Sequence, residues 1–173
     1  ENKFKKYEFI ISRTELKNTS GIAFYGEKIY VADGVQNQIL SHKLTDLTFN
    51  GAQVWNREAL DISKSSSLCI DGNVYILSLD GAILKYRRGN RADFEQTQIA
   101  PTVEKAKKIE CATDGRLIVL ETGQTKRIIE YTKDGKLINQ TTSKSFVNPV
   151  DLTLGPNGTI FVLDSNRILK FKK

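Results

Sequence analysis

The sequence predicts an all-β fold, a β-propeller of four-stranded antiparallel blades, and three observations predict it. An apolar four-residue segment recurs at a nearly constant spacing, a turn signal precedes most copies, and no segment has a sustained helical periodicity. Short strands joined by turns, repeated about every 43 residues, are typical of propeller blades. The chain holds four such repeats, which form a whole ring or part of a larger one.

The second strand of each blade is the clearest element. Its apolar segments open at residues 29, 74, 117 and 160, in steps of 45, 43 and 43. All four positions are apolar in each copy, as expected for a strand buried on both faces between neighbouring blades. Gly72, Gly115 and Gly158 follow Asp or Asn just ahead of the last three copies, and Gly26 precedes the first. Such pairs supply the positive φ angles of tight hairpin turns.

The other strands follow from the same frame. First strands are expected at residues 21–24, 67–70, 108–111 and 150–154, and third strands at 39–43, 83–87, 128–132 and 168–172. Less regular fourth strands are expected at 49–55, 94–99 and 137–141, and an outer strand at 4–12. The single domain, residues 1–173, therefore divides into blade repeats near 19–56, 66–100, 107–142 and 149–173.

The closure of the ring has alternative interpretations. The strand at residues 4–12 can complete the last blade, which lacks a fourth strand, and so close a four-bladed ring without exposed edges. The chain can instead belong to a larger ring, which we favour because it contains no methionine and so reads as a processed or excised piece of a longer protein. Completion by a second chain is a third alternative, and the sequence leaves the oligomeric state open.

Composition sets further bounds on the protein. The net charge of +6 suits an anionic partner, although a lysine-rich solvated surface explains it equally well. No apolar run approaches the length of a membrane-spanning helix, so we expect a soluble domain without a transmembrane segment. Cys69 and Cys111 fit no metal motif and are expected to be small core residues. The compartment stays open, with an extracytoplasmic part of a longer protein as one alternative.

Residues 149–168 resemble an NHL repeat. They run from a proline through an apolar strand, an Asn-Gly turn, a second strand ending in Asp164 and an Asn-containing loop to Arg167-Ile168. The copy at residues 20–44 is similar, whereas the copies that end their second strand in Glu121 and Ser78 depart from the pattern. The resemblance implies propeller blades, usually six to a ring, and in some members RNA binding on a positive face.

Candidate catalytic and metal-binding residues are few. His42, the only histidine, occupies a third-strand position that is aromatic in the other blades, which indicates packing. Asp33, Glu121 and Asp164 end second strands and are weak metal candidates, because ring symmetry brings these positions to one face. Their repetition instead favours a capping role in each blade's own loop. We therefore expect no cofactor, no catalytic residues and no enzyme activity.

The function predicted from the sequence is a binding or scaffold module that presents propeller-face loops to a protein or surface partner. One alternative is single-stranded RNA binding on a basic face. The other is a metal-dependent hydrolase similar to lactonases, built on the carboxylates. The candidate residues of the binding face are Tyr25, Arg87, Arg88, Arg91, Lys126 and Arg127.

Overall fold

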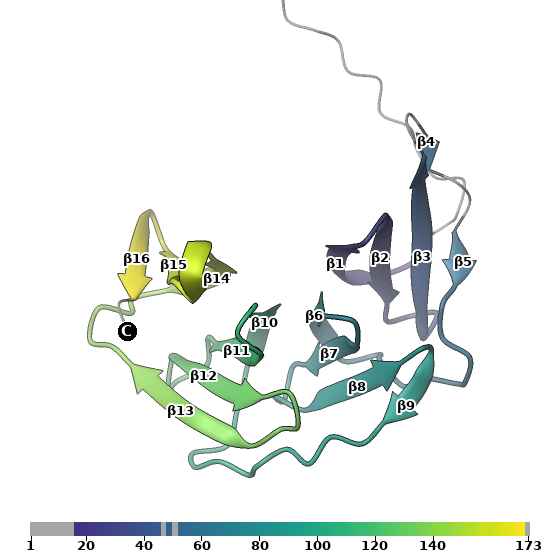
Figure 1. The fold of residues 1–173 in the computed structure, drawn as a ribbon. Helices are drawn as coiled ribbons and strands as arrows, with labels where there is room; N and C mark the ends of the chain where they lie inside the picture. The colour runs from purple at the N-terminus through teal and green to yellow at the C-terminus, as the bar shows by residue number, and fades with distance from the viewer. Residues whose placement is uncertain (1–15, 46–47, 50–51, 172–173) are drawn as a thin grey trace, which may run out of the picture.

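The computed structural model describes residues 16–45, 48–49 and 52–171, and nearly all of its regular structure is β (Figure 1). The predicted fold class is confirmed, because the strands form four small antiparallel sheets that are arranged as propeller blades. The outer strand expected at residues 4–12 lies outside the described residues. No helix in the described part of the chain is long and apolar enough to cross a membrane.

Each blade is a meander of consecutive strands. Blade 1 contains β1 (Thr19–Tyr25), β2 (Lys28–Asp33), β3 (Gln38–Thr45), β4 (Thr48–Phe49) and β5 (Gln53–Val54). Blade 2 contains β6 (Ser65–Ile70), β7 (Val74–Ser78), β8 (Ile83–Arg87) and β9 (Asn90–Ala92). Blade 3 contains β10 (Ala106–Cys111), β11 (Arg116–Glu121), β12 (Arg127–Thr132) and β13 (Leu137–Thr142). Blade 4 contains β14 (Pro149–Leu154), β15 (Ile160–Asp164) and β16 (Arg167–Phe171).

The blades lie side by side in an open arc, with the first strand of each blade innermost (Figure 1). Contacts run from β1 to β6, from β6 to β10 and from β10 to β14, so each blade meets its neighbour in sequence. Three hydrophobic clusters fill the three boundaries between consecutive blades. Blades 1 and 4 stand at the two ends of the arc.

The antiparallel meander gives the arc two faces. We call the face that carries the turns between first and second strands, and between third and fourth strands, the turn face. The loops that follow the second strands, at residues 34–37, 79–82, 122–126 and 165–166, lie at the opposite ends of the strands and form the loop face. Second strands are the most buried elements, as predicted; every residue of β7 is buried.

The fourth strand predicted at residues 94–99 is wrong. The fourth strand of blade 2 is β9, and the chain then leaves the sheet toward blade 3, where the amide of Thr97 donates to the carbonyl of Gly135 at 2.9 Å. The side chain of Gln96 takes the place of a strand: its Oε1 accepts from the amide of Ile83 at 2.9 Å, and its Nε2 donates to the carbonyl of Gly81 at 2.8 Å. In blade 1, the segment predicted as one strand at 49–55 is divided between β4 and β5.

Candidate binding site on the turn face

A basic groove of about 660 Å³ lies on the turn face of blade 2. Four of its lining side chains are cationic, and Asp93 is the one acidic residue among those that line it. The lining residues are Gly72, Asn73, Lys85, Arg87, Arg88, Arg91, Ala92 and Asp93. The groove therefore carries an excess of positive charge that favours an anionic ligand.

The hairpin between β8 and β9 positions the arginines. Arg88 and Gly89 both have positive φ, at 52° and 88°, which is the geometry of a two-residue turn that matches the twist of the strands. A side chain at Gly89 would meet the carbonyl of Trp55, so glycine is required there. The turn places Arg87, Arg88 and Arg91 together at its exposed tip.

The cations of the groove differ in their partners. The guanidinium of Arg91 lies 5.4 Å from the ring centroid of Tyr86, a cation–π contact. Lys85 is largely buried and donates to the carbonyl of Lys133 at 3.0 Å in the next blade. Within the described part of the chain, neither Arg87 nor Arg88 forms an ion pair. These two guanidinium groups are the ones best placed to receive an anionic partner.

Tyr25 joins this groove from blade 1. Its exposed side chain stands at the turn between β1 and β2, and its hydroxyl lies next to Gly72, a residue that lines the groove. The structure thus brings four of the six predicted binding-face residues to one part of the turn face. Lys85 and Asn73 belong to the same groove and were missed by the sequence reasoning. Side chains two residues apart on a strand lie on the same face of the sheet, so the spacing of Lys85 and Arg87 in β8 could have identified Lys85 from the sequence.

Lys126 and Arg127 do not belong to this surface. Lys126 lies on the loop face, and its ammonium donates to the carbonyl of Val147 at 2.9 Å. The side chain of Arg127 is only 1% exposed and pairs with Glu121, with Nε 2.5 Å from Oε2. Arg127 also donates to Gln140 Oε1 and to the carbonyl of Pro101. Of the six candidate residues, Lys126 and Arg127 therefore lie apart from the groove on blade 2.

The three carboxylates proposed as weak metal candidates are each bonded within their own part of the ring. Asp33 accepts from the backbone amides of Lys17, Asn18, Val35 and Gln36. Burial raises the pKa of Asp33, but these amide donors outweigh it and hold the pKa below its usual value of 3.8. The carboxylate thus ties the loop after β2 to the segment before β1.

Asp164 and Glu121 have the same role in their blades. Asp164 accepts from the amides of Val147 and Asn148 and from Arg167. Burial alone would raise the pKa of Asp164, but the ion pair with Arg167 and the amide donors lower it. Glu121 accepts from the amide of Glu104 at 2.9 Å and from Arg127. In the described residues, no three or more His, Cys, Asp or Glu side chains gather in a group that could hold a metal ion.

A second groove, of about 600 Å³, lies between blades 3 and 4. Arg116 lines it, and was not singled out by the sequence reasoning. Its guanidinium pairs with Asp114 at 2.8 Å and also with Glu130. Because both carboxylates already balance the charge of Arg116, this groove offers a weaker attraction to an anion than the groove on blade 2.

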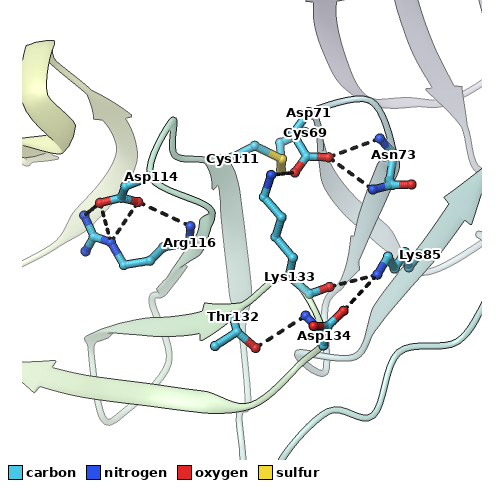
Figure 2. Close-up of polar contacts among 10 residues, drawn as sticks. All are labelled: Cys69, Asp71, Asn73, Lys85, Cys111, Asp114, Arg116, Thr132, Lys133 and Asp134. Atoms are coloured by element: carbon cyan, nitrogen blue, oxygen red, sulfur yellow. Dashed lines mark hydrogen bonds and ion pairs between the residues drawn. A yellow bond between two sulfur atoms is a disulfide. The ribbon is translucent and has the colours of Figure 1, made fainter.

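The cysteines are not separate core residues, so that expectation is corrected. Cys69 in β6 and Cys111 in β10 form a disulfide across the boundary between blades 2 and 3 (Figure 2). Ion pairs on the turn face connect the same blades. Lys133 Nζ lies 2.7 Å from Asp71 Oδ2, and Lys85 Nζ lies 3.4 Å from Asp134 Oδ1. The wall of the basic groove is therefore held to blade 3 by covalent and ionic contacts.

Comparisons with known proteins support the fold. No protein-family model and no curated protein matches the chain, so the resemblance to NHL repeats is not confirmed at the level of the family. Among solved structures, a Bacteroides uniformis protein assigned as a 6-phosphogluconolactonase aligns with a TM-score of 0.66 at 18% identity, over 90% of this chain and 50% of that one. A protein assigned as a gluconolactonase aligns with a TM-score of 0.66 at 15% identity, over 91% of this chain and 60% of that one.

BamB from Moraxella catarrhalis aligns with a TM-score of 0.59 at 13% identity, over 86% of this chain and 41% of that one. The chain thus spans between two fifths and three fifths of the length of these three proteins. The expectation that the protein is not an enzyme is corrected, because the same blade arrangement occurs in two proteins assigned as lactonases. The small number of candidate catalytic residues in the sequence was too narrow a ground for that expectation. At these identities the likeness shows the fold alone: this chain is a run of four β-propeller blades.

Proposed function

We propose that the chain is a binding module that holds an acidic segment of a protein partner in the basic groove on the turn face of blade 2. One observation carries the proposal. Arg87 and Arg88 stand exposed at the tip of a hairpin with a two-residue turn, without an ion pair among the described residues, beside Lys85 and Arg91 in the same groove. A carboxylate that reaches this tip can accept two parallel hydrogen bonds from one guanidinium.

The surroundings of the arginines also suit a protein interface. Tyr25 stands next to the groove with its side chain exposed, and tyrosine and arginine are enriched among the residues that contribute most to binding at protein interfaces. The hairpin is held by the main-chain bond from the amide of Arg57 to the carbonyl of Gly89 at 2.8 Å. A preorganised surface loses little conformational entropy when it binds, which favours affinity.

The two alternatives have weaker support. Single-stranded RNA binds best where several aromatic rings stack successive bases along a charged groove. Of the two tyrosines that we place at the groove, Tyr25 is exposed and Tyr86 is buried, so one of the two rings is accessible for stacking. A lactonase-like site on the carboxylates is not favoured, because Asp33, Glu121 and Asp164 already accept hydrogen bonds from their own blades.

Fluorescence anisotropy tests the proposal with two labelled probes, a glutamate-rich peptide and a single-stranded RNA pool, at about 50 and 200 mM salt. The peptide should bind and should weaken as salt rises. The variant Arg87→Gln/Arg88→Asn should lose about tenfold in peptide affinity, which corresponds to about 1.4 kcal/mol. Asparagine is chosen at position 88 because it tolerates the positive φ of the turn.

Lys126→Asn is the control for the Arg88→Asn half of this variant, because each of the two substitutions removes one charge at a residue with positive φ, but Lys126 lies on the loop face. It should leave peptide binding unchanged. An equal loss in the control would show that binding follows net charge and not the groove, and no binding at low salt would refute the proposal. Tighter binding of RNA than of peptide, lost in the arginine variant, would assign the groove to RNA.

A further inference from the structure

Blades 1 and 4, at the ends of the arc, each have one face without a neighbouring blade. The equivalent faces of the other blades are buried between consecutive blades. The pairing Ile22↔Val31 in blade 1 corresponds to Leu68↔Ile76, Ile109↔Val119 and Leu152↔Val162 in the other blades. Leu68, Ile109 and Leu152 are each 0–3% exposed, because they pack against the preceding blade. Ile22 has no preceding blade and is 66% exposed. Phe24, two residues along the same strand, is also exposed.

The other end of the arc shows the complementary face. The pairing Leu163↔Ile168 in blade 4 corresponds to Ala32↔Ile39, Leu77↔Ile83 and Leu120↔Ile128. In blades 1 to 3 these residues are 0–3% exposed, because they pack against the next blade. Ile168 is 71% exposed, and it lines an apolar groove of about 290 Å³ with Phe161 and Leu163.

These two faces are the two halves of one repeated interface. At every internal boundary, the residue equivalent to Ile168 and the residue equivalent to Ile22 lie in the same hydrophobic cluster: Ile39 with Leu68, Ile83 with Ile109, and Ile128 with Leu152. An exposed apolar surface of this kind marks an interaction site. A residue in the position of Ile22 is therefore the expected partner of Ile168. Ile22 of the same chain does not take that place, because blades 1 and 4 lie at the two ends of the arc and do not meet (Figure 1).

We propose that a second copy of this chain covers both faces, with blade 4 of each copy packed against blade 1 of the other, so that two arcs close one eight-bladed ring. Figure 1 shows an open arc with blades 1 and 4 at its two ends, and a second arc joined to it at both ends would leave no blade face uncovered.

The dimer would contain two identical interfaces, each of the kind that already holds consecutive blades together. A head-to-tail contact of this type normally builds rings or filaments, and it closes after two copies when each copy contributes half of the ring.

Sedimentation equilibrium of the 173-residue chain tests the proposal directly. The mass should be twice the 19.5 kDa of one chain. The variants Ile22→Asp and Ile168→Asp should each halve that mass, because either one places a charge in both interfaces of the dimer. Ile138→Asp, on the exposed face of the outer strand β13, is the matched control and should stay dimeric. Circular dichroism checks that each variant remains folded.

Mixing the two variants distinguishes the pairing of unlike ends from the pairing of like ends. In a heterodimer of Ile22→Asp with Ile168→Asp, one interface carries no substitution, so the mixture should regain a dimer that neither variant forms alone. If blade 1 instead paired with blade 1, the Ile168→Asp variant would stay dimeric by itself. A wild-type chain that sediments as a monomer, or as an open series of larger species, would overturn the proposal; a monomer would assign the cover to blades outside these 173 residues.

Discussion

Cys69 and Cys111 are 42 residues apart in sequence, yet their Cα atoms lie 5.6 Å apart and their sulfurs are bonded. They occupy the innermost strands of blades 2 and 3, β6 and β10, which are neighbours around the axis. One blade repeat along the chain is therefore one step around the arc, and a covalent bond joins the two steps. The same boundary carries the ion pair between Lys133 and Asp71 (Figure 2).

The disulfide should contribute about 4 kcal/mol to the free energy of unfolding, because it closes a loop of about 43 residues in the unfolded chain. The double variant Cys69→Ala/Cys111→Ala should therefore unfold at a clearly lower urea concentration than the oxidised protein. Reductant should lower the midpoint of the wild type by a similar amount and should not change that of the double variant. An unchanged midpoint in reductant would show that the bond does not stabilise the fold.

Arg127→Met should destabilise the protein by about 3–5 kcal/mol, because it leaves the carboxylate of Glu121 buried without its cationic partner. Adding Glu121→Gln to this variant should recover part of the loss, since a neutral amide costs less to bury than an unpaired carboxylate. Urea unfolding of the two variants measures both effects. A double variant less stable than Arg127→Met alone would contradict this account of the pair.

Acid should weaken the fold through Asp33 and Asp164. Both carboxyl groups have a pKa below the usual 3.8 in the folded protein, so the unfolded chain binds protons more readily than the folded one. Their contribution to stability is complete above about pH 3.8 and is lost as the pH falls below that value toward the folded pKa. Unfolding midpoints measured from pH 6 down to pH 2.5 should show this decline.

Asp164→Asn is the variant that isolates this effect, because an amide has no proton to gain in the range. Its stability should be lower than that of the wild type at pH 6, and the difference should shrink as the pH falls. A difference that stays constant from pH 6 to pH 2.5 would mean that the charge of Asp164 does not stabilise the fold.

Gln96→Ala should destabilise the protein by about 1–3 kcal/mol, because the amide of Ile83 and the carbonyl of Gly81 both lose a hydrogen-bond partner. Gln98→Ala is the control, since that side chain is exposed two residues away on the same segment. Thermal unfolding of the two variants compares them. Equal small effects would show that Gln96 does not replace a fourth strand in blade 2.

The repeat made most of the fold predictable. The second strands were predicted at 29–32, 74–77, 117–120 and 160–163, and each lies within the strand observed. Local signals suffice there, because a continuous apolar segment bounded by turn residues has few other ways to bury itself. The fourth strands lie at the rim, where a single side chain such as Gln96 can replace main-chain pairing, so their position was predicted less well.

The candidate site was predicted in part, because local sequence determines the position of some of its residues but not the partners that come from distant segments. Arg87, Arg88 and Arg91 lie on one hairpin, so local sequence already places them together. Arg127 looked like another surface cation, but Glu121, Gln140 and Pro101 enclose it from three different segments. Charge alone does not distinguish an exposed arginine from a buried and paired one, because the partners come from distant parts of the chain.

The sequence by itself determined the all-β blades, their number and the turns that separate their strands, because these depend on patterns within about ten residues. Only the tertiary structure decided that Cys69 bonds Cys111, that Arg127 is buried and that Ile22 and Ile168 remain exposed at the ends of the arc. Ile168 and Ile83 occupy the same position in their repeats, and whether another blade lies against that position depends on how the blades are placed around the axis.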